Sequence, residues 1–353
     1  MADQSKLRVV QWATGNVGTR SLRRVVEHPD LEMVGLYVSN PDKVGLDAAR
    51  LIERDIGYAG ICPDTGVIAT SSLADIVALK ADCVLYMRQG TDLDEVCAIL
   101  AAGTNIVTTR GDFHHPPSMD PAVRARVEAA CAKGGSSIFS QGCSPGFITE
   151  SMLLTLTQLS RRVDCITIDE YADMTSRNSP DLIFNVMGYG VSPGQFDQNK
   201  VDYVKHDFAA SLAQTADALG IDIDAWEAFG ELSSAKATKT IAAGVIEAGT
   251  VGAQRITIEG KQSGQVRLRF RANWYCTADI EHDWNLRESG WRVQVEGDTP
   301  LDVSITYPVS AELYPSVTPG FTAHPAVNAV HAVCAAAPGI CTTDSMARVV
   351  GRY

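Results

Sequence analysis

The sequence predicts an α/β protein with a doubly wound parallel sheet, followed by an α+β domain that has an open mixed or antiparallel sheet. Two observations carry this prediction. As far as about residue 140, short β-rich runs alternate with helical patterns, which is typical of βαβ units. Beyond residue 235 β segments predominate, and one of them alternates Arg267, Arg269 and Arg271 with Leu268 and Phe270. This period of two indicates a half-exposed strand.

The first half supplies the strands and helices of a Rossmann-like domain. Its strand-like runs are 7–12, 31–39, 67–69, 82–86, 105–108 and 136–140. Its helical patterns are 17–27, 73–80, 93–102 and 121–133. The last of these begins with proline, which is tolerated in the first turn because the missing N–H has no helical partner there. Short links between such elements imply right-handed crossovers and a parallel sheet.

The second half has a different order of elements. A strand at 164–173 is followed by a Gly/Pro-rich stretch at 178–194 and a helix at 206–220. Further β segments are expected at 238–242, 255–259, 266–276, 291–296 and 301–307. A final helix at 325–336 stops at Pro338-Gly339. We therefore predict one domain over 1–145, a second over 146–320, and a C-terminal helical segment over 321–353 that packs back on the first domain.

Length and composition narrow the class of protein. The 353 residues suggest two domains, and 45% hydrophobic content is ample for a core. A net charge of −12 without a basic block disfavours nucleic acid as a partner. No apolar run reaches the ~18 residues of a membrane span, and no signal peptide is evident. The nine cysteines lack a C-x-x-C pair, which disfavours zinc and disulfides. We expect a cytoplasmic protein without membrane, metal or nucleic-acid ligands.

A glycine-containing turn follows the first strand and opens the first helix. It matches the G-x-G-x-x-G frame with Ala13 in the first place. Gly15 would let the backbone approach a pyrophosphate, and Gly18 would allow helix and strand to pack closely. The helix N-terminus adds free N–H groups and partial positive charge. A tight turn without ligand is the alternative. The predicted cofactor-binding residues of this turn are Thr14, Gly15, Asn16, Val17 and Gly18.

The choice between NAD and NADP depends on the end of the second strand. NAD-binding domains of this type carry an acidic residue about 20 positions after the glycines, where it holds the ribose 2′-OH. Here Ser39 and Asn40 occupy that place, with Lys43 nearby and Arg20 early in the first helix. Without a carboxylate to repel a 2′-phosphate, we predict NADP, with NAD possible. A solvated loop is the alternative interpretation of Lys43.

Ligands of doubly wound sheets bind beyond the carboxyl ends of the strands, where three polar segments are expected. Asp112 is a candidate general base or amine anchor. His114 and His115 could titrate near neutrality, or could simply face solvent. A metal site is disfavoured because adjacent histidines rarely converge. A Cys143 nucleophile is conceivable, although an inert buried thiol is favoured. Further cofactor candidates are Arg88, Thr108, Thr109, Cys143 and Asn328, and substrate candidates are Phe147, Tyr171 and His114.

An ordered set of segments resembles the 2,4-diaminopentanoate dehydrogenase family. These segments are VQWATGNVG at 10–18, NIVTT at 105–109, CSPGF at 143–147, and Asn328 with Ala337-Pro338-Gly339. Native amine dehydrogenases are relatives, and dihydrodipicolinate reductases are more distant ones. The resemblance spans nearly the whole chain. It implies a homodimer with an N-terminal Rossmann domain, an α+β substrate domain and no metal.

The resemblance also implies the chemistry, which is NAD(P)-dependent oxidative deamination of an amine or reductive amination of a ketone or aldehyde with ammonia. Family members with this activity place a glutamate after the Thr-Thr segment, where it orients ammonia and assists proton transfer. This chain has no glutamate there; Asp112 is the closest match, with Gly111 as the competing alignment. We expect Asp112 to be the catalytic carboxylate. A carbonyl or other C=N reductase independent of ammonia, and a non-catalytic NADP-binding protein, are the alternatives.

Overall fold

The computed structural model describes residues 5–56, 63–194, 196–310 and 312–353. The chain forms two compact units, one from Met1–Ser151 with Ser316–Tyr353 and the other from Met152–Pro315. Sequence analysis places these boundaries at 145 and 320 instead. They differ because a helical segment after Cys143 prolongs the first unit, and because the last long helix starts earlier than predicted. No helix in the described part of the chain combines the length and the apolar composition that a membrane span requires.

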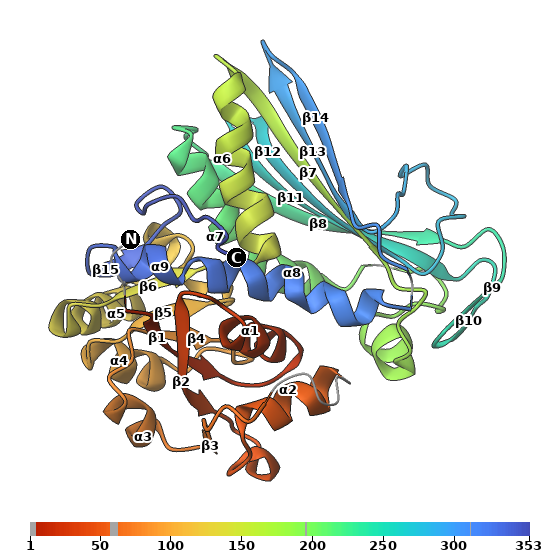
Figure 1. Ribbon diagram of the computed structural model, residues 1–353. Helices are drawn as coiled ribbons and strands as arrows, with labels where there is room; N and C mark the ends of the chain where they lie inside the picture. The colour runs from red at the N-terminus through yellow and green to blue at the C-terminus, as the bar shows by residue number, and fades with distance from the viewer. Residues whose placement is uncertain (1–4, 57–62, 195, 311) are drawn as a thin grey trace. The chain divides into compact units, whose positions relative to one another are not determined.

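The first unit contains a fully parallel seven-stranded sheet in the order β15-β6-β5-β4-β1-β2-β3 (Figure 1). The order reverses beside β1, as in doubly wound folds. The α/β fold predicted from the sequence is therefore confirmed. The strands are β1 (Leu7–Trp12), β2 (Leu31–Tyr37), β3 (Ala69–Thr70), β4 (Cys83–Tyr86), β5 (Asn105–Thr108), β6 (Ser137–Ser140) and β15 (Gly339–Cys341). The helices are α1 (Asn16–Val26), α2 (Ala48–Ile56), α3 (Leu73–Ala78), α4 (Leu93–Ala101), α5 (Pro121–Gly134), α8 (Tyr314–Asn328) and α9 (Val330–Cys334).

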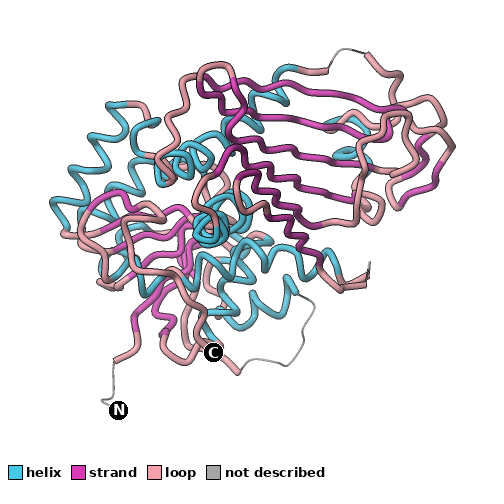
Figure 2. The backbone as a smooth tube through the Cα atoms, turned by 90° about the horizontal axis from the view of Figure 1, so that it is seen from above, coloured by secondary structure: helices cyan, strands magenta, loops and turns pink. Residues whose placement is uncertain are grey.

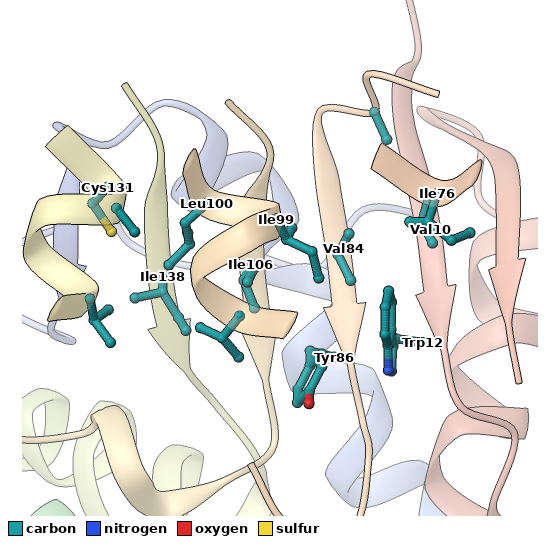
Figure 3. Packing of buried hydrophobic residues seen from close by; sticks show 14 of the residues in the cluster. Val10, Trp12, Ile76, Val84, Tyr86, Ile99, Leu100, Ile106, Cys131 and Ile138 are labelled. Carbon is teal, nitrogen blue, oxygen red and sulfur yellow. The ribbon is translucent and has the colours of Figure 1, made fainter. Parts of the chain in front are cut away.

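Apolar side chains cover both faces of this sheet. On one face Val10, Val84 and Ile106 pack against α3, α4 and α5, as Figure 3 shows for the side chains that it labels. On the other face Val9 and Leu85 pack against α1, α8 and α9. Burial on both faces explains why these strands read as continuous apolar runs.

Four features of the first unit were not predicted from the sequence. Helix α2 was missed, and β3 starts at Ala69 because the preceding Ile68 bridges to Asp47 instead. The predicted helix at 325–336 is two helices, and α8 runs through Pro319 and Pro325, so that its prolines do not mark its start. Gly339, expected only to end the chain's last helix, begins β15, which extends the sheet by pairing with β6.

The second unit contains a six-stranded mixed sheet in the order β14-β13-β7-β12-β11-β8, whose long strands lie side by side in Figure 2. Only the β7–β12 pairing is parallel. These strands are β7 (Val163–Asp173), β8 (Ala225–Ser234), β11 (Val251–Gln262), β12 (Gln265–Tyr275), β13 (Gly290–Gly297) and β14 (Leu301–Thr306). A separate hairpin is formed by β9 (Lys239–Ile241) and β10 (Gly244–Ile246), and the α-helices are α6 (Met152–Leu156) and α7 (Gln198–Ala218).

Helix α7 covers one face of the mixed sheet. Phe208 of α7 stacks on Phe270 of β12, with ring centroids 4.2 Å apart. The helix begins at residue 198, not 206, because Asp197 caps it by accepting a hydrogen bond from the Asn199 backbone N–H. Strand β8 and helix α6 were both missed by sequence analysis. The eight cysteines of the described residues form no disulfide with one another, and Cys62 lies outside the described residues.

The C-terminal helices bring a histidine pair together in the first unit. His28 and His331 have ring centroids 6.2 Å apart, and His28 Nδ1 accepts a hydrogen bond of 3.1 Å from the Asp30 N–H. Burial is the main cause that lowers the pKa of both imidazoles from 6.5. Protonation of His28 at Nδ1 would also remove the acceptor of the Asp30 N–H, so this hydrogen bond would be lost. The folded state therefore binds fewer protons than the unfolded chain just below pH 6.5.

We expect the thermal stability to fall as the pH drops through about 6.5, since the unfolded state then gains protons that the folded state resists. Calorimetry between pH 7.5 and 5.5 measures this fall in melting temperature. The variant His28→Asn, whose amide oxygen can still accept the Asp30 N–H, should show a smaller fall than the wild type. The control variant His206→Asn, at an exposed site on α7, should show the same fall in melting temperature as the wild type. Equal falls in all three proteins would contradict the assignment to His28.

Candidate active site

The carboxyl ends of the parallel strands form the candidate site of the first unit. Because the strands are parallel, the segments after β1, β2, β4, β5 and β6 leave the sheet at the same edge. The reversal of strand order beside β1 opens a crevice at this edge in doubly wound folds, and nucleotides bind there. Most of the cofactor-binding residues predicted from the sequence lie in these segments.

The turn after β1 has the geometry that a pyrophosphate requires. A Cβ atom placed on Gly15 would meet nothing within 4 Å, so its backbone faces open space. A Cβ atom on Gly18 would lie 2.2 Å from the carbonyl oxygen of Ala13, so that only glycine fits between helix and strand. Ala13 itself has φ 73°, the left-handed conformation that glycine usually provides at this place. Gly15 caps α1 without a side-chain hydrogen bond, which leaves N–H groups of the first turn for a ligand.

Gln11 and Ser21, which were not predicted as site residues, hold this turn by hydrogen bonds. Gln11 Nε2 donates to the carbonyl oxygen of Ala13 over 3.0 Å. Ser21 Oγ donates to Gln11 Oε1 over 2.7 Å, and both side chains are buried. The sequence gives little sign of this contact, because a glutamine inside an apolar strand has no motif of its own. These hydrogen bonds hold Ala13 in its unusual conformation.

Lys43 reaches from the segment after β2 to the glycine turn. Its Nζ donates to the backbone oxygen of Thr14 over 2.9 Å and to Thr14 Oγ1 over 3.1 Å. Ser39 and Asn40 are exposed beside it, and Asn40 Oδ1 accepts the Asp42 N–H. Here the structure brings together the residues predicted to recognise the ribose end of a dinucleotide.

Two predicted cofactor-binding arginines, Arg20 and Arg88, contact other parts of the protein. Arg20 donates to the backbone oxygen of Ser316 over 3.1–3.3 Å, at the start of α8. Arg88 forms an ion pair of 2.8 Å with Glu95, and this hydrogen bond is the main cause that raises the pKa of Arg88. Since Glu95 compensates the Arg88 charge, the arginine is a weaker phosphate ligand than the sequence suggests.

An aromatic cluster ends three neighbouring strands. Trp12 of β1 stacks on Tyr37 of β2, with ring centroids 3.7 Å apart, and lies 5.6 Å from Tyr86 of β4. Burial is the main cause that raises the pKa of Tyr86, whose hydroxyl donates to Glu95 over 2.7 Å. An aromatic residue at the end of each of three adjacent strands was the signal that sequence analysis passed over. Trp12 and Tyr86 have no exposed surface, so the cluster is part of the hydrophobic core at the ends of these strands.

The segment after β5 carries the predicted catalytic aspartate. Thr108 is buried, its Oγ1 accepts the Arg110 N–H over 3.1 Å, and Thr109 beside it is half-buried. Asp112 Oδ2 accepts a hydrogen bond of 2.6 Å from Thr91 Oγ1. Arg110 Nε lies 3.7 Å from the same oxygen, which is ion-pair distance but beyond a hydrogen bond. The Asp112 side chain is 30% exposed, so this carboxylate is both held and accessible.

Both histidines of this segment are buried, which corrects the alternative that they face solvent. His114 Nδ1 lies 2.6 Å from Glu150 Oε1, and Thr343 Oγ1 donates to Glu150 Oε2. His115 turns to Ser118 instead, with 2.5 Å between its Nδ1 and the serine Oγ. Glu150 was missed by sequence analysis, because its burial and its partners exist only in the folded chain. Among the described residues, no three His, Cys, Asp or Glu side chains converge as metal ligands.

The segment after β6 holds polar atoms that lack partners. Gln141 Oε1, Ser144 Oγ and, from α8, Asn328 Oδ1 are buried without a hydrogen-bond partner among the described residues. Each such atom costs about 1–3 kcal/mol unless a ligand or water satisfies it. Hydroxyl and carboxamide groups, as in a nicotinamide riboside, could supply the missing partners. Cys143 is buried and Phe147 is exposed, as expected for an inert thiol and a surface available to a ligand.

In the second unit, Tyr171 and Glu170 are adjacent on β7, so their side chains lie on opposite faces of the sheet. Tyr171 lies on the sheet face of Asp169, buried in a cluster with Tyr275 and Trp284. Glu170 lies on the opposite face, where Trp274 Nε1 and Trp291 Nε1 donate to its two carboxylate oxygens over 3.3 and 3.0 Å. Glu170 is therefore a polar group beside aromatic rings, whereas the predicted substrate residue Tyr171 packs in an apolar cluster.

A glycine turn that opens a helix beside the strand reversal of a doubly wound sheet is the arrangement with which dinucleotide-dependent dehydrogenases bind their cofactor. Residues 147–350 match the family model described as the 2,4-diaminopentanoate dehydrogenase C-terminal domain. The chain belongs to this family, as the ordered segments predicted, and is an NAD(P)-dependent dehydrogenase that acts on amines.

Individual relatives agree with this assignment. An amine dehydrogenase of Streptomyces virginiae is 27% identical over 317 residues, which is 85% of this chain and 84% of that protein. A 2,4-diaminopentanoate dehydrogenase of Acetoanaerobium sticklandii is 21% identical over 228 residues, 62% of each chain. The solved structure of an amine dehydrogenase from Mycobacterium smegmatis aligns with a TM-score of 0.74 at 17% identity, covering 100% of this chain and 99% of that one.

Proposed function

We propose that the protein transfers a hydride between NADP(H) and the carbon of a small imine, in the oxidative deamination of an amine or the reductive amination of a ketone or aldehyde. The observation that carries this proposal is the accessible carboxylate of Asp112, held by Thr91 at the sheet edge that also carries the glycine turn. The similarity to two amine-acting dehydrogenases supports it. The natural carbonyl partner would be small, with ammonia as second substrate.

The residues at the sheet edge fit the cofactor in two parts. The backbone of 14–18 would hold the pyrophosphate, with Lys43, Ser39 and Asn40 at the ribose phosphate. Ser144, Gln141 and Asn328 would bind the carboxamide and ribose at the nicotinamide end. When bound, the reduced cofactor supplies the hydride. Thr108, Thr109 and Cys143 would border this end of the site.

The remaining chemistry would fall to side chains of the chain itself. Asp112 would accept a hydrogen bond from an N–H of ammonia or of the bound amine, and its charge would favour the cationic nitrogen that develops. Thr91 keeps Oδ2 in place, so that the carboxylate needs little reorganisation. Phe147 would offer an apolar surface to the carbon chain of the substrate.

The first test is consumption of NADPH and of NADH with a panel of small ketones and aldehydes, each with and without ammonia. Ammonia-dependent oxidation of the cofactor is expected. Turnover without ammonia would instead assign a carbonyl reductase, and tight NADPH binding without turnover would assign a cofactor-binding protein. The homodimer and the cytoplasmic location stay predictions, and sedimentation equilibrium would check the first.

Replacing Lys43 by glutamine should weaken NADPH more than NADH. A hydrogen bond to a charged group contributes roughly 1.5–3 kcal/mol, so we expect the Kd of NADPH to rise about tenfold or more while that of NADH changes little. Cofactor fluorescence measures both constants. Lys133→Gln is the matched control, because Lys133 is exposed in the last turn of α5 and precedes the amino end of β6. Equal losses for the two cofactors would show that Lys43 does not recognise the 2′-phosphate.

A further inference from the structure

A buried histidine–glutamate pair includes His114, which lies two residues after the predicted catalytic aspartate in the chain. Glu150 has no exposed surface and His114 is 3% exposed. The pair joins three segments of the first unit, since His114 follows β5, Glu150 follows β6, and Thr343 follows β15. Burying a carboxylate is costly unless a cation or hydrogen-bond donors compensate it. Here the Thr343 hydroxyl and the His114 ring compensate the carboxylate, so the fold holds a charged group in a fixed place next to an imidazole.

The contact is mainly electrostatic. The two atoms are 2.6 Å apart, but Glu150 lies out of line with the ring N–H, so Nδ1 has no aligned hydrogen bond. The attraction is thus strongest when the imidazole is protonated. Nδ1 is buried and faces the carboxylate, which leaves Nε2 as the ring nitrogen that is not directed at Glu150.

We propose that His114 is the acid–base group of the reaction and that Glu150 is its positioning residue. This inference rests on the proposed function, and it assigns the proton transfer that a single short aspartate would otherwise have to perform. A base whose far nitrogen faces a carboxylate is the arrangement that activates histidine in many enzymes. Asp112, two residues away on the same segment, would then bind the nitrogen of the substrate while His114 moves the proton.

The step assigned to His114 is the dehydration of the carbinolamine. The imidazolium donates its Nε2 proton to the hydroxyl oxygen, and the C–O bond breaks with its electron pair, which releases water. The nitrogen lone pair forms the C=N bond, so the products are an iminium ion and neutral imidazole. A proton from solvent then restores the imidazolium. In the direction of amine oxidation, the same nitrogen takes a proton from the water that adds to the iminium ion.

Charged groups occur on each of the segments that carry His114, Glu150 and Thr343. Glu150 faces it from the segment after β6, and Asp112 and Arg110 lie on its own segment. Asp344, on the C-terminal segment, accepts a hydrogen bond from Thr342 next to Thr343. Glu150 is the group in ion-pair contact, so its removal should change the electrostatic potential at His114 most.

The experiment compares His114→Asn, Glu150→Gln and the matched control His115→Asn by kcat, KM and pH profile. We expect kcat for ammonia-dependent turnover to fall about 10²-fold or more in H114N, since acid–base catalysis contributes 10²–10⁴-fold. In E150Q the limb of the profile that reports the protonated form should move to lower pH. H115N, the neighbouring buried histidine that contacts Ser118, should keep kcat within about threefold, because no role in proton transfer falls to it.

Two further measurements separate a catalytic role from a structural one. Thermal unfolding and NADPH binding show whether each variant is folded, and added imidazole should restore part of the activity of His114→Ala. Where H114N does not fold, the E150Q profile decides, and an unmoved limb would overturn the proposal. Wild-type kcat in a folded H114N would overturn it while leaving the proposed function intact. A wild-type protein without ammonia-dependent turnover would instead refute the proposed function, and this inference with it.

Discussion

Asparagine in place of Asp112 should lower ammonia-dependent turnover by about 10²-fold or more, while the Kd for NADPH stays nearly unchanged. The substitution keeps the size of the side chain and can keep a hydrogen bond to Thr91, but it removes the charge. A neutral amide stabilises a developing ammonium or iminium cation far less than a carboxylate does. Steady-state kinetics with saturating NADPH, together with fluorescence titration of the cofactor, measure both quantities.

The control for this prediction is Asp94→Asn. Asp94 is 87% exposed and pairs with Arg126 on the surface, so its loss should leave kcat unaltered. Asp112→Glu should retain turnover to within about tenfold, because it keeps the charge and restores the side-chain length implied by the family, at the cost of a shift of about 1 Å. Full turnover in folded D112N would remove Asp112 from the catalytic machinery.

Alanine at Gly18 and alanine at Gly15 should have opposite effects, although the two glycines belong to one turn. At Gly18 the new methyl group would lie 2.2 Å from the Ala13 carbonyl oxygen, so helix and strand must move apart. Such overpacking costs about 1–3 kcal/mol, which corresponds to several degrees in melting temperature. At Gly15 the methyl group meets nothing in the protein, so the melting temperature should not change.

Cofactor binding completes the comparison of these two variants. Gly15→Ala should raise the Kd for NADPH by about tenfold or more, because the methyl group occupies space that the pyrophosphate needs. Calorimetric unfolding and NADPH titration measure both variants side by side. A destabilised G15A would contradict the open space beside Gly15, and a G15A that binds NADPH like the wild type would place the pyrophosphate away from this turn.

The sequence was sufficient to predict those features whose signal comes from neighbouring residues of the chain. Strand–helix alternation predicted the parallel sheet, and the glycine turn with Lys43 nearby predicted one end of a dinucleotide site. An ordered set of short motifs predicted the family. These signals need no partner elsewhere, since periodicity, backbone freedom at Gly15 and Gly18, and motif order are properties of contiguous residues.

Other features were decided only by tertiary contacts. Arg88 and Lys43 carry the same charge, but Arg88 forms an ion pair with Glu95. Charge alone therefore could not show which of the two is the better phosphate ligand. Strand β15 exists because β6 offers it an edge, and its three residues have little strand signal of their own.

The site itself shows the same division. Sequence analysis found Asp112 and His114, which lie in one polar segment after a strand. It missed Glu150, which meets His114 only because parallel strands bring the ends of β5 and β6 to one edge. Alternation along the predicted strand puts Tyr171 and Glu170 on opposite faces, but only the folded chain shows that Tyr171 packs in an apolar cluster and that Glu170 contacts tryptophan rings. Residue type and local pattern can be read from the sequence. Burial, charge pairing and the orientation of side chains depend on contacts between distant segments.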